Sequence, residues 1–380
     1  MGEINVLLRA SAPRSYRAAR LLGTLDDGRL ETLETRIRCD APPDATEEWR
    51  LGLILGPSGS GKTTVARRVY GSIFDARRDW REDVAAIDAF DSVDYETLER
   101  ALSAVGFGSP PRQLLPYAAL SGGERFRVDL ARALLEARAR GGIAVVDEFA
   151  GLLDAATRRS AAIATRRALD LGVFGAARLV AISGRDELAE ELEPDWVLDM
   201  RDGRVRRGRL RRRPIELGIV RAPRELWNDF KALHYLSGSL NPSAQCFAAR
   251  LLETGEEVGF AALLPSEGRR GRRRVHRLAV RADRQGQGLG GAFLDALGEL
   301  CRDEFGTILE IVAGLPFFAR RLRESAKWRE KYVYPYGRTQ RHKGRAAPGS
   351  FGRAIASFEF LGDAPPSSGE MEESLSKVKK

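Results

Sequence analysis

The chain has 380 residues, 43% of them hydrophobic, which is enough for two domains with buried cores. Its net charge of +9 favours partners that carry phosphate groups. The longest apolar runs, LGLIL from residue 51 and FAALLP from residue 260, are far shorter than the roughly 18 to 20 residues that span a bilayer. Because the N-terminal segment also lacks the apolar stretch of a secretory signal, we expect a cytoplasmic protein.

Residues 1–207 alternate short apolar runs with amphipathic helical stretches. The runs are LGLIL, IAVVD from residue 143 and RLVAIS from residue 178. This alternation predicts an α/β fold with a parallel sheet covered by helices. The sequence WVLDMRDGRV that follows predicts a closing hairpin, and the arginine-rich segment 208–214 predicts a linker to a second domain.

A glycine-rich loop follows the first apolar run. GPSGSGKTT fits the pattern G-x-x-x-x-G-K-[ST] and leads into a helical sequence. In such a loop backbone N–H groups converge on phosphates, while a lysine reaches the terminal phosphates and a hydroxyl holds Mg²⁺. Lys62 is the only lysine in residues 1–230, where arginine is used elsewhere. The ATP-binding residues expected here are Gly56, Ser58, Gly59, Gly61, Lys62, Thr63 and Thr64.

Two further motifs complete the predicted nucleotide site. The apolar strand sequence GGIAVVDEF ends in Asp147, which can share the Mg²⁺ with Thr63, and in Glu148, which can polarise the attacking water. LSGGERFRVDLARAL at 120–134 predicts a helix that begins with a signature sequence. Its anion-binding N-terminal end would hold phosphate through Ser121, Gly122 and Gly123.

These three motifs, in this order, resemble the ABC ATPase family. The resemblance implies ATP hydrolysis, a P-loop fold with a helical insertion, and two composite sites in a head-to-tail homodimer, with Asp154 as the D-loop aspartate. The family's Q-loop glutamine is missing, with Asp88 as a candidate replacement, and Arg185 takes the place of the switch histidine. These departures and a short insertion indicate slow or tuned hydrolysis, with no membrane subunit as partner.

The second half, 215–363, predicts a smaller α/β domain. It opens on the strand sequence IELGIV, continues through a predicted helix around AARLLET at 248–254, and reaches the strand sequence EVGFAALLP. The three cysteines, Cys39, Cys246 and Cys301, lack metal-ligand or disulfide-framework spacing and are expected to be packing residues. From residue 364 the composition becomes polar, which predicts a disordered tail over 364–380.

HRLAVRADRQGQGLGGAFLDALGEL carries a second phosphate-binding signal. An apolar strand runs into a glycine turn and then a helix with Leu289, Phe293, Leu297 and Leu300 on one face. The turn resembles the Q/R-x-x-G-x-G/A motif of the GNAT acyltransferase family. The resemblance implies that it grips the pyrophosphate of acyl-CoA, expected to be acetyl-CoA, while the strand backbone pairs with the pantetheine arm. The residues concerned are Leu278, Val280, Gln285, Gly286, Gln287, Gly288, Leu289 and Gly290.

A GNAT site needs a path that deprotonates the amine and an acid for the departing thiolate. His276, which alternates in phase with Leu278 and Val280, and His234 are candidates for the first role, and a structural role is equally consistent with each. The tyrosines of KYVYPYG, at 332, 334 and 336, are candidates for the acid, although an alternating strand is the favoured interpretation.

Nearly all of residues 50–330 resembles a group of bacterial and phage proteins in which an ABC-type ATPase is fused to a GNAT domain. Two arginine-rich stretches, 201–214 and 268–277, fit either solvated segments or a phosphate-binding surface. The leading hypothesis is an ATPase and acyltransferase that acts on a nucleic acid or nucleobase. The alternatives are a clamp on DNA or RNA with a non-catalytic, CoA-binding GNAT domain, and a protein or polyamine acetyltransferase.

Overall fold

The computed structural model describes residues 2–9, 15–24, 34–74, 80–209, 214–234, 238–335, 340–342, 345–347 and 354–362. The chain divides into two compact units, Met1–Asp79 with Asp129–Arg212 and Trp80–Val128 with Arg213–Lys380. The predicted tail and residues 210–213 of the predicted linker lie outside the described residues. No helix within the described part of the chain is long and apolar enough to cross a membrane.

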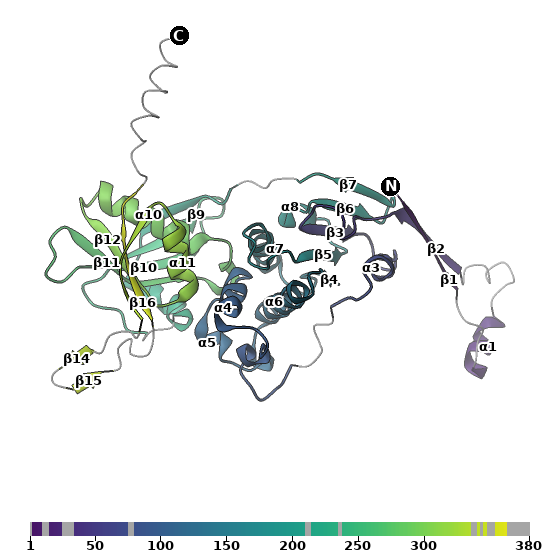
Figure 1. The fold of residues 1–380 in the computed structure, drawn as a ribbon, viewed down its shortest axis with the longest axis horizontal. Helices are drawn as coiled ribbons and strands as arrows, with labels where there is room; N and C mark the ends of the chain where they lie inside the picture. The colour runs from purple at the N-terminus through teal and green to yellow at the C-terminus, as the bar shows by residue number, and fades with distance from the viewer. Residues whose placement is uncertain are drawn as a thin grey trace, which may run out of the picture. The chain divides into compact units, whose positions relative to one another are not determined.

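The first unit is built on a five-stranded sheet in the order β4-β5-β3-β6-β7 (Figure 1). The strands are β3 (Leu51–Leu55), β4 (Ile143–Val146), β5 (Arg178–Ser183), β6 (Trp196–Asp199) and β7 (Arg204–Arg207). The first four run parallel, and β7 closes the sheet antiparallel to β6. Every position of β3 is buried, as expected for a central parallel strand. The predicted parallel sheet and closing hairpin are confirmed.

Helices and a short ribbon surround this sheet. They are α3 (Lys62–Tyr70), α6 (Gly122–Arg140), α7 (Ala155–Asp170), α8 (Leu188–Leu192), and the antiparallel pair β1 (Glu3–Arg9) and β2 (Glu34–Asp40). Helix α1 (Tyr16–Leu22) lies between β1 and β2 in sequence. The core beside the P-loop strand contains two tryptophans, Trp49 and Trp196, whose rings lie 5.5 Å apart and edge to face. A side chain at Gly52 would put its Cβ 2.0 Å from the Trp196 ring, so glycine is required there.

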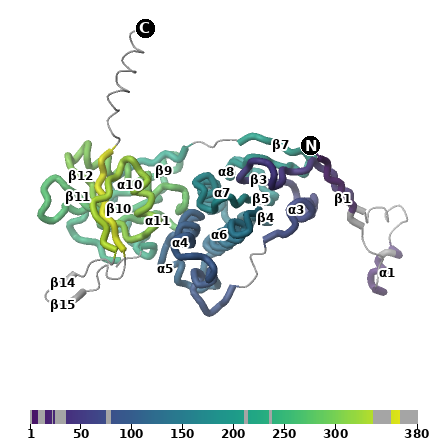
Figure 2. The backbone as a smooth tube through the Cα atoms, in the orientation of Figure 1, coloured from purple at the N-terminus to yellow at the C-terminus, as the bar shows by residue number. Residues whose placement is uncertain are grey.

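The second unit contains a seven-stranded sheet in the order β13-β16-β12-β11-β10-β9-β8. The strands are β8 (Leu217–Arg221), β9 (Gln245–Leu251), β10 (Glu257–Pro265), β11 (Arg272–Val280), β12 (Ile308–Ala313), β13 (Trp328–Tyr334) and β16 (Ile355–Phe360). Among the strands that the structure describes in this unit, β11 and β12 alone pair in parallel. A separate hairpin joins β14 (Gln340–His342) to β15 (Arg345–Ala347). Figure 2 draws the backbone of β9 to β12 as a tube.

The helix predicted around 248–254 is wrong. Residues 248–251 belong to strand β9, which pairs with β8 on one side and β10 on the other. Four consecutive residues of β9, Cys246 to Ala249, are buried between these neighbours. Burial inside a sheet outweighs the helix preference of alanine and leucine, which amounts to less than about 1 kcal/mol per residue.

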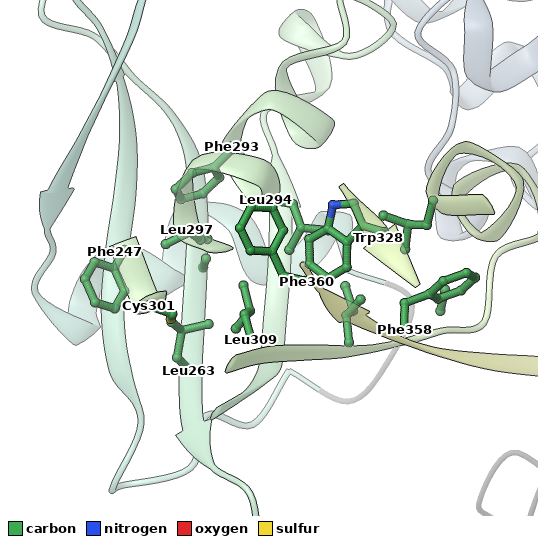
Figure 3. Packing of buried hydrophobic residues seen from close by; sticks show 14 of the residues in the cluster. Phe247, Leu263, Phe293, Leu294, Leu297, Cys301, Leu309, Trp328, Phe358 and Phe360 are labelled. Carbon is green, nitrogen blue, oxygen red and sulfur yellow. The ribbon is translucent and has the colours of Figure 1, made fainter. Parts of the chain in front are cut away.

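Helices cover both faces of the second sheet. The larger core lies under α10 (Leu289–Asp303) and α11 (Pro316–Glu324), where Phe293 and Leu297 meet strand residues such as Leu309 (Figure 3). The short helix α9 (Trp227–Phe230) packs on the other face, with η4 (Arg224–Leu226) and η5 (Lys231–Leu233) beside it. The predicted apolar face of α10 is confirmed. All three cysteines are free and buried, which confirms their packing role.

A helical segment from the first half of the sequence packs within this second unit. It contains η2 (Ala86–Ala89), α4 (Tyr95–Ala104), α5 (Pro110–Gln113) and η3 (Tyr117–Ala119). Figures 1 and 2 show α4 beside α11. A carboxylate oxygen of Glu99 accepts a hydrogen bond of 3.0 Å from the backbone N–H of Phe317, and Glu96 pairs with Arg320. The insertion expected of an ATPase cassette is therefore attached to the C-terminal half.

Glu99 is expected to make the attachment pH-dependent. Burial raises its pKa from 4.5 to about 7, so the folded protein binds more protons than the unfolded chain between these pH values. The free energy of unfolding therefore falls as pH rises through this window, by up to about 3 kcal/mol. Glu99→Gln keeps an acceptor for Phe317 and removes the charge, so calorimetry should show a higher melting temperature than wild type at pH 8 and little difference at pH 5. Glu96→Gln, on an exposed side chain, is the control, and an equal difference at both pH values for Glu99→Gln would contradict this account.

Candidate active sites

The P-loop connects β3 to α3 in a conformation that needs its glycines. Gly56, Gly59 and Gly61 have φ of 154°, 79° and 88°, which other residues rarely adopt. A Cβ at Gly61 would also lie 2.3 Å from the Ile37 side chain. Ser58 is exposed in this loop, and Lys62, Thr63 and Thr64 form the first turn of α3.

Lys62 and Thr63 are fixed by short hydrogen bonds. The Lys62 ammonium donates to the carbonyls of Gly56 and Pro57 at 2.7 and 2.8 Å, so it lies over the loop. The Thr63 hydroxyl donates to a carboxylate oxygen of Asp147 at 2.8 Å, although 84 residues separate the two. Hydroxyl and carboxylate oxygens at this spacing suit Mg²⁺, which takes few protein ligands and keeps positions for phosphate and water.

Glu148 follows directly at the end of β4. Its backbone N–H donates to Asp147 at 2.9 Å, its φ of 49° lies in the left-handed region, and its side chain is exposed. A non-glycine residue at positive φ is strained and marks a position held by its surroundings. Within the described residues no cluster of three or more His, Cys, Asp or Glu side chains could hold a metal.

The signature sequence forms a helix cap. The N–H of Ser121 donates to the Glu124 carboxylate at 2.8 Å, and the N–H of Glu124 donates back to the Ser121 hydroxyl at 3.3 Å. This reciprocal pair is a capping box, and Arg112 holds Glu124 through two further bonds of 2.6 and 2.5 Å. A Cβ at Gly122 would meet nothing within 4 Å, so the start of α6 is open to an anion. The S-x-x-E spacing was the sequence signal for this cap.

The departures from the ABC pattern also have defined places. Arg185 follows β5, and its guanidinium donates to the carbonyl of Gly151 at 3.0 Å in the GLLD segment. Asp154 caps the start of α7 by accepting the Thr157 N–H at 3.0 Å. Hydrogen bonds from the Thr157 side chain and then from its N–H lower the pKa of the Asp154 carboxyl. Asp88 is exposed in η2.

In the second unit, strands β11 and β12 diverge. They pair over three residues only, Arg272–Arg274 against Ile308–Glu310, although β11 continues to Val280. Beyond Arg274 the β12-facing edge of β11 therefore has no strand partner among the described residues. Leu278 and Val280 lie on this stretch, and their other edge pairs with Ala261 and Gly259 of β10. Such an edge can accept an extended ligand through backbone hydrogen bonds.

The glycine turn connects this edge to helix α10. Gly286 has φ of 81°, and Gly288 has φ of 87° and is the N-cap of α10. Leu289 and Gly290 begin the helix, so backbone N–H groups of its first turn are available to a phosphate. The Gln285 side chain donates to the carbonyl of Val280 at 3.1 Å and thus ties the turn to the open edge of β11.

The expected alternation of His276 with Leu278 and Val280 is interrupted. Between Ala262 and Leu263 the partner position on β11 moves from Arg277 to Val275, which makes His276 the extra residue of a β-bulge. Its Nε2 accepts the Asn241 N–H at 3.2 Å, so this lone pair already has a donor. His234 is half-buried, 5.6 Å from Trp227 and edge to face.

Two of the three tyrosines of KYVYPYG lie on a strand, in agreement with the interpretation favoured from the sequence. Tyr332 and Tyr334 are on β13, with ring centroids 4.9 Å apart. Tyr336 lies outside the described residues.

Comparison with known proteins bears on the second unit directly. Residues 242–326 match the family model of the acetyltransferase (GNAT) domain. The match covers the diverging strands, the glycine turn and helices α10 and α11. No curated protein matches the chain.

Solved structures of two kinds are similar to the chain. An IAA acetyltransferase from Bacillus cereus ATCC 14579 is 17% identical over 38% of this chain and 99% of its own, with a TM-score of 0.30. The ribosomal-protein-S18-alanine N-acetyltransferase from Escherichia coli is 18% identical over 40% of this chain and 98% of its own, with a TM-score of 0.30. A dimeric bacterial ABC transporter cassette is 18% identical over 47% of this chain and 91% of its own, with a TM-score of 0.34.

The chain thus combines the three nucleotide motifs with a stretch that matches the GNAT domain model. The nucleotide motifs are the P-loop between β3 and α3, the Asp-Glu pair after β4, and the signature sequence at the start of α6. No sequence motif marks Arg127 as a functional residue. It is a buried arginine of α6 whose guanidinium donates hydrogen bonds to the turn before Gln285.

His276 is expected to stay uncharged across the physiological pH range. Burial, then the charges of Arg277 and Arg274, lower the pKa of its imidazole to about 4. Because the folded-state pKa is depressed, the neutral ring dominates at every pH above that value. The chain has three histidines, so a side-chain NMR titration with His276→Gln as the assignment variant can follow each one. The His276 resonance should not shift between pH 8 and pH 5.5. An inflection near pH 6.5 would show that the ring is solvated and able to act as a base.

Proposed function

We propose that this protein is an ATP-dependent acyltransferase, in which the GNAT domain transfers an acetyl group to an amino group of a nucleic acid or nucleobase. The single observation that carries the catalytic part is the divergence of β11 from β12 directly beside the glycine N-cap of α10. In this arrangement a single glycine-rich turn joins an open strand edge to a helix end that can bind phosphate. The GNAT family match over the same residues supports it.

The residues of the GNAT stretch would bind acetyl-CoA and position it. Acetyl-CoA, when bound, supplies the activated acetyl group. The first-turn N–H groups of α10, from Leu289 onward, would hold its pyrophosphate, helped by the positive end of the helix dipole. The β12-facing edge of β11 at Leu278 and Val280 would align the pantetheine arm and so position the thioester along this strand. The bulge at His276 turns the strand at this point. His234 is the candidate left to deprotonate the acceptor amine, because the Nε2 lone pair of His276 already accepts the Asn241 N–H.

The cassette residues would bind ATP and hydrolyse it. Lys62 would neutralise the terminal phosphates, Thr63 and Asp147 would hold Mg²⁺, and Glu148 would orient the attacking water. The open start of α6, at Ser121 to Gly123, would complete the site of a second protomer, so the active form is a homodimer. No membrane subunit takes part in this proposal.

The choice of a nucleic acid as the acceptor rests on positive charge. The chain carries +9, and Arg270 at the tip of the β10–β11 turn is exposed. Its neighbours are partly neutralised, since Arg269 and Arg272 pair with Glu310 at 3.5 and 2.7 Å. In the other stretch, Arg207 pairs with Glu47 at 2.6 Å. This internal pairing favours a protein or polyamine acetyltransferase as the second candidate, because exposed phosphate-binding charge is smaller than the composition suggests.

Labelled acetyl transfer can identify the acceptor class. The full-length protein is incubated with ¹⁴C-acetyl-CoA, ATP and Mg²⁺, and separately with DNA, tRNA, spermidine and denatured host protein. We expect label in the nucleic-acid fraction that survives protease and is released by nuclease. Label in spermidine or protein alone would replace the proposed acceptor with the second candidate. Absence of label in every fraction, with acetyl-CoA bound, would favour a non-catalytic CoA-binding clamp.

A further inference from the structure

Arg127 is a buried cation in the helix that carries the ATPase signature. It lies on α6, six residues after Ser121, and its side chain is 2% exposed. The guanidinium donates to three backbone carbonyls, those of Gly106 at 2.8 Å, Ala282 at 2.8 Å and Asp283 at 3.0 Å. Burying a cation is costly unless it is hydrogen-bonded, so these carbonyls are held firmly in place around it.

Two of the three carbonyls belong to the turn that precedes the acyl-CoA loop. Ala282 and Asp283 form η6 (Ala282–Arg284), and Gln285, the first residue of the predicted pyrophosphate motif, follows at once. From Gln285 only two residues remain before Gly288, the N-cap of α10. The position of η6 therefore sets the position of the glycine turn.

The loop after α4 makes the same connection from a second side. The N–H of Gly108 donates to the side-chain oxygen of Gln285 at 3.3 Å, while the Gln285 amide donates to Val280. Gly106 approaches so closely that a Cβ there would lie 2.5 Å from the Gln285 carbonyl oxygen. Gly106 also accepts one of the Arg127 hydrogen bonds. A single bonded cluster thus joins α6, the 106–108 loop, the glycine turn and the open edge of β11.

We propose that Arg127 is a positioning residue of the acyl-CoA loop, and that through it the signature helix couples nucleotide-driven dimerisation to acetyl-CoA affinity. This inference rests on the proposed function. Ser121 and Arg127 lie on one helix, roughly 9 Å apart along its axis, so a phosphate bound at the helix start acts on the element that fixes η6. By thermodynamic linkage, acetyl-CoA must then change nucleotide-driven dimerisation by the same factor.

The test measures acetyl-CoA binding to the full-length protein by isothermal titration, with and without a non-hydrolysable ATP analogue and Mg²⁺. We expect the analogue to change the wild-type dissociation constant for acetyl-CoA about fivefold or more. Arg127→Met should weaken acetyl-CoA binding roughly tenfold or more and reduce the analogue's effect to less than about twofold. Arg127→Lys, which keeps the charge, should restore part of both.

Two further variants keep the test decisive. Arg132→Met, on the same helix and paired with Glu136, is the matched control and should leave acetyl-CoA binding unchanged. Gly106→Ala keeps the Arg127 side chain, but its Cβ would lie 2.5 Å from both Arg127 Nη1 and the Gln285 carbonyl oxygen. It should therefore displace the same bonded cluster and weaken acetyl-CoA binding even if Arg127→Met does not fold. Equal affinities in all variants, with and without the analogue, would overturn this inference alone. A wild-type protein that does not bind acetyl-CoA would overturn the proposed function and this inference with it.

Discussion

Gly288→Glu is expected to lower acetyl-CoA affinity about 100-fold or more and to leave ATP hydrolysis unchanged. Gly288 is the N-cap of α10 at φ of 87°, where a side chain adds backbone strain on the order of 1–2 kcal/mol. The new carboxylate would also occupy the positive end of the helix, where the pyrophosphate should bind. Titration calorimetry with acetyl-CoA and a phosphate-release assay with ATP measure the two activities separately.

Gly306→Glu is the matched control for this variant. Gly306 is exposed, has φ of 58°, and a Cβ there would meet nothing within 4 Å. The substitution therefore introduces the same charge and similar backbone strain just after the end of α10, away from its N-terminal turn. Acetyl-CoA affinity should be retained in Gly306→Glu. An equal loss in both variants would show that Gly288 matters for folding of the GNAT domain rather than for pyrophosphate binding.

Glu148→Gln is expected to slow ATP hydrolysis about 100-fold or more with little change in ATP affinity. The amide cannot polarise water as the carboxylate does, while Lys62, Thr63 and Asp147 are untouched. Because ATP then persists, the variant should accumulate as a nucleotide-bound dimer, which light scattering after size exclusion can detect.

Glu187→Gln provides the comparison, since Glu187 is an exposed carboxylate at the start of α8. It should hydrolyse ATP as wild type does. If Glu148→Gln retained more than about a tenth of the wild-type rate, another group would have to orient the attacking water, and the catalytic role assigned to Glu148 would be lost.

The nucleotide motifs could be predicted because their chemistry is local. Backbone N–H groups can converge in this loop only if Gly56 and Gly61 adopt positive φ near Lys62. The glycine spacing in the sequence therefore predicts the backbone conformation directly. The pairing of Thr63 with Asp147 is long-range, but each residue is marked by its own motif. The apolar face of α10 follows from helical periodicity in the same way.

Other features depend on contacts that the sequence does not encode locally. The attachment of 80–128 to the C-terminal half rests on pairs such as Glu99 with Phe317 and Arg127 with Ala282, which are more than 150 residues apart. Strand β9 has helix-favouring residues, and only its neighbours in the sheet explain its conformation. The bulge at His276 shifts the register by one residue, which no pattern of alternation along the strand reveals.

The rate of CoA thiol release from acetyl-CoA tests the central claim most directly. It should be measured on the full-length protein with the acceptor that becomes labelled, in the presence and absence of ATP and Mg²⁺. We expect release that requires the acceptor and changes severalfold with ATP. Release that is absent under all conditions, or that is identical with and without nucleotide, would contradict an acyltransferase under the control of its ATPase cassette.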